Sequence, residues 1–528
     1  MMIVRGAIKW SIPRNPRFRT PRRVVPRSGR SYGTSGSSAT PQGAQLSASS
    51  MLGGLTIELD KLSPRFELQA SQINIIQAPA EFYSTLKDKI SNAQRRIYLS
   101  TLYIGKKEHE LISVIRNALK NNPDLEVSFL TDALRGTREA PDPSCASLLA
   151  PLVEEFGSQR VQIRMFHTPN LTGLRKKLIP RRINEGWGLQ HMKLYGIDDE
   201  IIMSGANLSQ DYFTNRQDRY HVFSSKEVTE YYARIFDTVS SISYNILPTR
   251  DNPAGYLMEW PASNPGPSPL SNPKEFVSTT TQLLAPYTRS PQPPPTPVSH
   301  GNGTLLYPLF QFTPILKPDT STELPAMRTI LRTLASPAFA DCRWSFTAGY
   351  FNMTPEVRSL LLATRPAGAT VVAASPWANG FYGSKGVSGL LPDAYTLLSR
   401  RFLDAVSRRG MGGRIALKEW RRGTVNEPGG WSYHAKGLWV TLPGERHPSV
   451  SLVGSSNYTK RSYSLDLEAN ALIVTGDEEL KKKLADEERW LQEYATKMDR
   501  DDYAKVERRV GIHVRIAMAV VRLVGGAL

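Results

Sequence analysis

The feature that most constrains the fold of this chain is a set of side chains that occurs twice in the same order, with matched spacing at its start and at its end. Each copy has a histidine, a lysine two residues later, an asparagine further on, and a carboxylate eleven residues after the asparagine. The members are His191, Lys193, Asn207 and Asp218 in the first half, and His434, Lys436, Asn457 and Glu468 in the second. Such an internal repeat predicts two similar halves and not a series of unrelated domains.

Strand patterns repeat in the same order. Short runs rich in β-branched and aromatic residues occur at residues 96–105, 125–132 and 161–166, with counterparts at 343–352, 369–375 and 414–417. Helical stretches alternate with these strands. The alternation predicts an α/β fold of two similar lobes, each a mixed sheet flanked by helices, arranged as a pseudo-two-fold dimer within one chain. A site on the pseudo-two-fold axis would receive one copy of each motif.

The N-terminus and the middle of the chain differ in composition from these halves. Residues 1–52 contain nine arginines and lysines and no acidic residue. This composition is typical of a mitochondrial transit peptide, although a disordered basic tail that binds nucleic acid would share it. Residues 256–303 are rich in proline and serine and are interpreted as a linker. The two lobes are therefore expected at residues 53–255 and 304–500.

The C-terminal stretch, residues 501–528, is predicted to form a basic amphipathic helix. Arg508, Arg515 and Arg522 recur at every seventh position, which would place them on one helical face. Such a helix would either lie in an anionic lipid interface or pack on the core of the protein. No uncharged apolar run is long enough to span a membrane.

The repeated side chains suit the chemistry of phosphodiesters, and the net charge of +18 favours partners that carry phosphate. Lysine and asparagine can hold the non-bridging oxygens and stabilise the charge of the transition state. One histidine can attack phosphorus, while the other protonates the leaving group and then takes a proton from the incoming alcohol. Asp218 and Glu468 are expected to orient the imidazoles. This chemistry requires no metal and no cofactor.

The two motifs resemble the signature of the phospholipase D superfamily, which is a duplicated HxKxxxxD motif followed by a G-[SA]-x-N segment. The first copy is complete from His191 to Asp198, but Thr441 stands where the second copy should have its aspartate. The resemblance implies two phospholipase D-like lobes. It also implies a catalytic set of His191, Lys193, Asp198, His434 and Lys436, supported by Asn207, Asp218, Asn457 and Glu468. The asymmetry between the copies favours His191 as the nucleophile and His434 as the acid and base.

Within this superfamily, residues 184–193, 204–220 and 434–439 are similar to the mitochondrial phosphatidyltransferases that use CDP-diacylglycerol and glycerol 3-phosphate. This similarity implies phosphatidyl transfer to glycerol 3-phosphate through a phosphohistidine, with release of CMP, in the synthesis of phosphatidylglycerol and cardiolipin. It also implies a peripheral location on the mitochondrial inner membrane. An anionic membrane surface is then an expected partner, and nucleic acid is not.

Three arginines are candidates for binding substrate. Arg135 and Arg138 follow the end of a predicted strand, where a loop could hold a phosphate, and Arg216 lies in one of the similar segments. Other functions stay open, because the same pair of histidines would serve a nuclease, another phosphodiesterase or a phospholipase.

Overall fold

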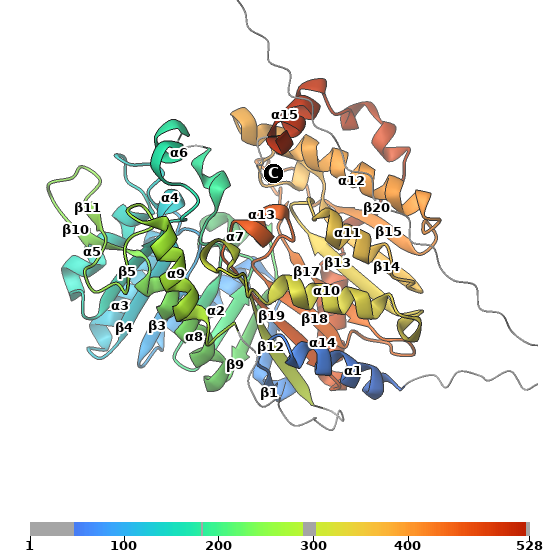
Figure 1. The fold of residues 1–528 in the computed structure, drawn as a ribbon, viewed down its shortest axis with the longest axis horizontal. Helices are drawn as coiled ribbons and strands as arrows, with labels where there is room; N and C mark the ends of the chain where they lie inside the picture. Colours follow the sequence, from blue (N-terminus) through green and yellow to red (C-terminus); the bar gives the residue numbers. More distant parts are fainter. Residues whose placement is uncertain (1–46, 181–182, 289–302, 524–528) are drawn as a thin grey trace, which may run out of the picture. The chain divides into compact units, whose positions relative to one another are not determined.

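Strands from the two halves form two nine-stranded sheets in the computed structural model, which describes residues 47–180, 183–288 and 303–523 (Figure 1). The first sheet has the order β11-β10-β5-β4-β3-β6-β7-β9-β2, and the second has the order β1-β12-β19-β18-β17-β13-β14-β15-β20. Within each sheet three neighbouring strands are parallel, β3 to β5 and β13 to β15, and antiparallel strands flank them. The two mixed sheets confirm the predicted α/β architecture of two similar lobes.

The parallel strands are buried along most of their length, and each has apolar residues in its middle, such as Phe129 in β4 and Val371 in β14. In the first sheet the strands are β2 (Ile73–Ile76), β3 (Arg96–Ser100), β4 (Glu126–Asp132), β5 (Val161–Phe166), β6 (Leu194–Ile197), β7 (Glu200–Ser204), β9 (Tyr220–Ser224), β10 (Tyr244–Pro248) and β11 (Tyr256–Glu259). In the second they are β1 (Phe66–Leu68), β12 (Thr304–Gln311), β13 (Arg343–Ala348), β14 (Gly368–Ala374), β15 (Ile415–Trp420), β17 (Lys436–Thr441), β18 (Val450–Gly454), β19 (Glu468–Thr475) and β20 (Ala495–Lys497).

Amphipathic helices cover these sheets, as α3 illustrates with Leu111, Ile115 and Leu119 buried at helical spacing. The helices of the first half are α2 (Pro79–Ser91), α3 (His109–Asn121), α4 (Ala133–Gly136), α5 (Cys145–Phe156), α6 (Gly173–Leu178), α7 (Gln210–Thr214) and α8 (Lys226–Ser241). Those of the second half include α10 (Glu323–Leu334), α11 (Pro355–Leu361), α12 (Leu391–Arg408), α13 (Lys460–Ser464) and α14 (Glu478–Trp490).

One hydrophobic core is shared by the two halves. It combines Tyr232 and Phe236 of α8 with Phe310 of β12 and Ala471 of β19. The Tyr232 hydroxyl also donates a hydrogen bond to the backbone carbonyl of Asn470 at 2.9 Å. This shared core fixes the two halves against each other, so residues from both can form one rigid site.

The expected boundary at residue 53 is wrong, because α1 (Ala48–Asp60) begins earlier and belongs to the second half. Met51 and Leu55 of α1 are buried in the core that contains β12, β13 and α10. β1 then pairs antiparallel with β12. The apolar face of α1 has to be buried, and the second sheet provides the surface. The predicted transit peptide otherwise lies in residues 1–46, outside the described residues.

The predicted linker at residues 256–303 is structured over much of its length. β11 extends the first sheet, and α9 (Pro273–Leu284) packs against α8. The sequence of α9 contains ordinary helix signals that its proline-rich surroundings conceal. Asn272 caps the helix, Pro273 occupies its first turn, and Phe276, Thr280 and Leu284 are buried at helical spacing. Residues 289–302 lie outside the described part of the chain.

The C-terminal prediction is wrong about where the helix begins. Two short 3-10 helices, Asp502–Ala504 and Val506–Arg508, come first, and α15 (Ile512–Leu523) follows. Arg508 therefore does not share a helical face with Arg515; it forms an ion pair of 2.6 Å with buried Glu419. One face of α15 packs on α12 through Val514 and Met518. In the described part of the chain, no helix is long and apolar enough to cross a membrane.

Candidate active site

The two histidine motifs meet because their backbones pair with the opposite half of the chain. The His191 amide donates to the Leu467 carbonyl at 2.9 Å, and the His434 amide donates to the Gln217 carbonyl at 2.8 Å. A short parallel sheet of β8 (Arg216–Gln217) and β16 (Ser432–Tyr433) continues the second contact. His191 and Lys193 lie just before β6 and not within it, because their segment pairs across the halves and not within its own sheet.

Each catalytic histidine is paired with a carboxylate from the opposite half of the chain. Nδ1 of His191 lies 2.8 Å from Oε2 of Glu468, and Nδ1 of His434 lies 2.6 Å from Oδ2 of Asp218. Both carboxylates are buried, so each fixes the ring of the histidine that the other half contributes. With Nδ1 occupied in this way, Nε2 is the nitrogen available for chemistry. The predicted orienting role of these two acids is thus carried by cross-half contacts.

The two lysines are both buried, and they are close enough to repel each other. Lys436 Nζ is 2.8 Å from His434 Nδ1 and 3.4 Å from Asp218 Oδ2. Lys193 Nζ donates to the carbonyl of His191 at 2.6 Å. Repulsion between the two ammonium groups contributes to lowering the pKa of Lys193 to about 7, after the larger effect of burial. A bound phosphate anion would counter this repulsion and favour both ammonium forms.

Burial keeps both imidazoles neutral in the free site. It lowers the pKa of His191 well below its ordinary value, with a further contribution from Lys193, and it lowers the pKa of His434 to about 3. Burial also raises the pKa of Glu468 to about 7. A neutral imidazole has a free lone pair, so either histidine could attack phosphorus.

Gly205, two residues before Asn207, is required by a close approach between the halves. A Cβ atom on Gly205 would lie 2.4 Å from Lys436 Nζ and 2.8 Å from the Asp218 carboxylate. Nearby, the Asn207 amide donates to the Tyr212 hydroxyl at 3.2 Å, and that hydroxyl lies 3.3 Å from Nε2 of His434. Asn207 therefore acts on His434 through Tyr212.

Asp198 does not lie in the active site, which corrects the catalytic set derived from the motif. Its carboxylate accepts hydrogen bonds of 2.8, 2.8 and 3.1 Å from the amides of Gln94, Arg95 and Arg96. These amides begin β3, at the opposite end of β6 from Lys193. The role of Asp198 is to hold the start of a strand. Its presence in only one copy cannot decide which histidine is the nucleophile.

The three arginines predicted to bind substrate have different surroundings, and Arg216 lies nearest to His434 among the contacts described. The guanidinium of Arg216 stacks 4.5 Å from the ring centroid of Tyr212, pairs with Asp211 at 2.8 Å and adds to the lowering of the His434 pKa. Arg135 stacks on Tyr103 at 4.3 Å, and Arg138 pairs with Glu185.

Asn457 differs from its counterpart in the first half. Its side-chain oxygen is buried and forms no hydrogen bond with any described residue. Its backbone amide, in contrast, donates a hydrogen bond to the Ser462 hydroxyl at 3.2 Å. The side chain of Asn457 is therefore available to a ligand.

A buried ion cluster behind the site could not be found from the motif. Arg219 forms hydrogen bonds of 2.8 and 2.7 Å with Glu487 of α14, and His221 bonds the same carboxylate at 2.8 Å. Arg219 also donates to the Leu452 carbonyl at 2.6 Å, which ties the residue after Asp218 to the second sheet. The only sequence signal was the position of Arg219 directly after Asp218 of the motif.

The fold and the crossed histidine–carboxylate pairs define a phospholipase D-like enzyme that acts on phosphodiesters. The family described as "Cardiolipin synthase, PLD-like domain" matches residues 86–240. In structure, the chain is similar to the phosphatidylserine synthase of Haemophilus influenzae, with a TM-score of 0.67, 20% identity, and coverage of 90% of this chain and 98% of that one. That likeness supports the fold.

Sequence relatives identify the particular family. A Saccharomyces cerevisiae protein named CDP-diacylglycerol–glycerol-3-phosphate 3-phosphatidyltransferase is 48% identical over 466 residues, which cover 86% of this chain and 88% of the relative. A Mus musculus protein of the same name, with the addition "mitochondrial", is 33% identical and covers 87% and 85%. The chain belongs to the family of CDP-diacylglycerol–glycerol-3-phosphate 3-phosphatidyltransferases, and it is a phosphatidyltransferase.

Proposed function

We propose that this enzyme transfers the phosphatidyl group of CDP-diacylglycerol to glycerol 3-phosphate through a covalent intermediate on His191. The observation that carries the proposal is the crossed arrangement of two neutral imidazoles, each oriented by a buried carboxylate of the other half. Two histidines in one pocket allow a double displacement, in which one forms the intermediate and the other moves protons.

In the first step, Nε2 of His191 attacks the phosphorus of the phosphatidyl group. A phosphorus–nitrogen bond forms while the phosphorus–oxygen bond to CMP breaks. His434 gives a proton to the departing oxygen, and Lys193 and Lys436 balance the charge on the non-bridging oxygens. Protonation of His434 is favoured once the substrate anion lies beside it, and ionised Asp218 at 2.6 Å supports the imidazolium.

In the second step, a hydroxyl of glycerol 3-phosphate attacks the same phosphorus. His434, now neutral, accepts the hydroxyl proton as the new phosphorus–oxygen bond forms. The bond to His191 breaks, and the imidazole is restored. The product is phosphatidylglycerophosphate, and His434 is protonated again for the next turnover.

The assignment of His191 as the nucleophile is supported by the surroundings of the two rings. His434 has its Nε2 within 3.3 Å of the Tyr212 hydroxyl, and the rings of Tyr212 and Tyr350 meet it edge to face. The described residues provide no comparable partner for Nε2 of His191. His191 is also the more accessible ring, with 10% of its side chain exposed against 4% for His434.

The test uses CDP-diacylglycerol labelled in the phosphatidyl phosphate, in detergent and without acceptor. Wild-type enzyme should release CMP and keep an acid-labile label, which glycerol 3-phosphate then discharges. His191→Ala should retain no label, whereas His434→Ala should form or discharge it slowly. A stoichiometric label on His191→Ala would overturn the assignment. Release of CMP at the same rate without acceptor, or hydrolysis of DNA, would overturn the transferase in favour of a phospholipase or nuclease.

Arg216 is the predicted arginine best placed to bind a substrate phosphate. It lies against Tyr212 beside His434, and it interacts electrostatically with Tyr350. Arg135 lies against Tyr103 and is the second candidate. Arg138 pairs with Glu185, as Arg216 pairs with Asp211, and is the third candidate. Arg216→Gln should raise the KM for one substrate more than it lowers kcat, and an unchanged KM for both would contradict this role.

A peripheral position on the mitochondrial inner membrane is part of the same proposal. The vertebrate relatives carry the word mitochondrial in their names, and a substrate with two acyl chains has to be reached at a lipid surface. The outer face of α15 exposes Ile512 and Ile516, and α6 exposes Leu174 and Leu178 beside a run of three basic residues. Exposed apolar side chains next to cations favour an anionic lipid interface.

A further inference from the structure

A cavity of about 320 Å³ lies between α12 and the segment that leads into α15. The helix α12 contributes Leu397 and Arg400 to its lining, and the chain around the start of α15 contributes Arg509 and Arg515. Figure 1 shows α15 beside α12, and apolar side chains of α15 pack on α12 next to the cavity. The cavity is therefore built into the contact between two packed helices.

The lining of this cavity is strongly basic. Among the described residues it contains four arginines and no carboxylate. One of the four, Arg508, is neutralised by buried Glu419 at 2.6 Å. The other three, Arg400, Arg509 and Arg515, are exposed and form no ion pair with any described residue. Three positive charges at one cavity without a counter-charge from the described part of the chain favour an anionic ligand.

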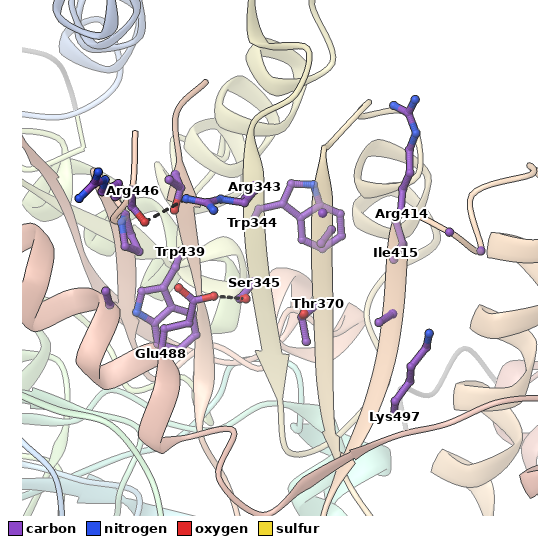
Figure 2. A pocket seen from close by; sticks show the side chains of 18 residues that line it. Arg343, Trp344, Ser345, Thr370, Arg414, Ile415, Trp439, Arg446, Glu488 and Lys497 are labelled. Atoms are coloured by element: carbon purple, nitrogen blue, oxygen red, sulfur yellow. Dashed lines mark hydrogen bonds between the residues drawn. The ribbon is translucent and has the colours of Figure 1, made fainter. Parts of the chain in front are cut away.

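A second cavity, at the end of the second sheet where β13 begins, differs in this respect (Figure 2). Arginines line it too, but Glu488 of α14 stands among them and accepts a hydrogen bond from the Ser345 hydroxyl, as the dashed line shows. Arg343 interacts electrostatically with the same carboxylate. The protein thus supplies a counter-charge to that cavity, whereas the cavity between α12 and α15 has none in its lining.

The position of Arg515 on α15 joins the cavity to an apolar surface. An α-helix turns about 100° per residue, so Arg515 lies about 60° from Ile512 in one direction and about 100° from Val514 in the other. Val514 is buried against α12, whereas Ile512 and Ile516 are 75% and 58% exposed. Arg515 therefore stands between the packed face and the exposed apolar face of the same helix.

We propose that the cavity between α12 and α15 binds the phosphate of an anionic phospholipid, an inference that rests on the proposed position of the enzyme at a lipid surface. Guanidinium groups bind phosphate oxygens through charge-assisted hydrogen bonds. The volume of about 320 Å³ suits a headgroup, and the acyl chains would lie outside it along Ile512 and Ile516. A free phosphate ion would leave these isoleucines uncovered, which favours the lipid.

The helix α12 also connects this cavity to the active site. Tyr395 of α12 stacks with Tyr350 at 5.9 Å between ring centroids, and the Tyr350 ring meets that of His434 at 5.0 Å. Thr396, the next residue of α12, lines the cavity. A phospholipid bound there would therefore hold α12, and with it one wall of the active site, at the surface from which a lipid substrate arrives.

The test measures binding of dihexanoylphosphatidic acid to the full chain by isothermal titration calorimetry. This soluble probe has one phosphate and two short acyl chains. The variant with Arg400→Gln, Arg509→Gln and Arg515→Gln loses the three unpaired guanidinium groups and should bind the probe at least about tenfold more weakly. Arg515→Gln alone changes one exposed side chain and should weaken binding by a smaller factor.

A matched control has Lys274→Gln, Arg365→Gln and Lys482→Gln. These substitutions remove the same charge at exposed positions elsewhere on the protein, so the control should keep wild-type affinity for the probe. Equal melting temperatures of the two triple variants would show that folding is unaffected.

Two comparisons separate the cavity from the active site and a lipid from a free phosphate. Lys436→Gln should keep the probe bound at the cavity. Ile512→Ser together with Ile516→Ser should weaken binding of the probe but not of inorganic phosphate, which should bind more weakly than the probe to wild type. The proposal is overturned if the cavity variant binds as tightly as wild type, if the control loses as much affinity, if Lys436→Gln alone abolishes binding, or if inorganic phosphate binds as well as the probe.

Release of CMP from CDP-diacylglycerol in detergent, measured on the same variants, distinguishes this inference from the proposed function. The cavity variant should keep the wild-type rate of release, because its three arginines lie outside the pair of histidines that carries the chemistry. Unchanged probe binding by a cavity variant that still releases CMP would refute the lipid site alone. Failure of wild-type enzyme to transfer the phosphatidyl group would refute the proposed function, whatever the cavity binds.

Discussion

Glu323 offers the sharpest test of the electrostatic reasoning. It begins α10, is completely buried, and neither of its carboxyl oxygens forms a hydrogen bond with a described residue. Burial raises its pKa to about 8, and the negative charge of Glu468 contributes. The folded protein therefore keeps a proton on Glu323 that the unfolded chain, with a glutamate pKa of about 4.3, releases.

The sign of the pH dependence follows from this difference. A carboxyl whose pKa is raised on folding costs no stability below about pH 4, and stability then falls by about 1.4 kcal/mol per pH unit until about pH 8. At pH 7 the cost of Glu323 is about 4 kcal/mol. Glu323→Gln has nearly the same shape and no charge to lose, so it should be about 3 to 4 kcal/mol more stable than wild type at pH 7.

The measurement is the denaturant midpoint of unfolding at pH 5, 7 and 8.5. The advantage of Glu323→Gln should be small at pH 5, grow to pH 7 and level off above pH 8. Glu356→Gln is a matched control on α11, because its partner Arg328 lowers the pKa of Glu356 and the substitution should bring no gain. A difference between Glu323→Gln and wild type that does not change with pH would refute the assigned pKa.

Further predictions concern the site and the membrane surface. Asp218→Asn should reduce CMP release by about 100-fold or more with little change in melting temperature, whereas Asp198→Ala should leave kcat nearly unchanged and cost about 1 to 3 kcal/mol of stability in denaturant unfolding. Gly205→Ala should fold but lose most activity, because its methyl group displaces the second-half lysine; wild-type kcat would contradict that contact. Replacing Ile512 and Ile516 by glutamate should reduce flotation with anionic vesicles while activity on detergent-dispersed substrate is kept, and unchanged flotation would exclude α15 as a lipid contact.

Local patterns were enough to predict the three parallel strands of each sheet and to select the histidines, lysines and carboxylates that the structure brings together. The strands β3, β4 and β5 and their counterparts β13, β14 and β15 were predicted from short runs rich in β-branched and aromatic residues, which favour buried strands. The repeated histidine, lysine and carboxylate were predicted because the same residue types recur with matched His–Lys and Asn–carboxylate spacings, which can be read without knowledge of the fold. The helix α9 was missed since prolines on either side hid its cap and its apolar positions.

Which residues act together was decided only by the packing of the two halves. Spacing in the sequence joined Asp198 to His191, yet the intervening strand β6 carries the aspartate to the far end of the sheet, where it binds backbone amides. Glu468 has no sequence relation to His191, but it lies 2.8 Å from it because Leu467 pairs with the His191 backbone across the halves. A motif fixes residue types along one chain segment, whereas a hydrogen bond depends on distance in space, and that distance is set by the core the halves share.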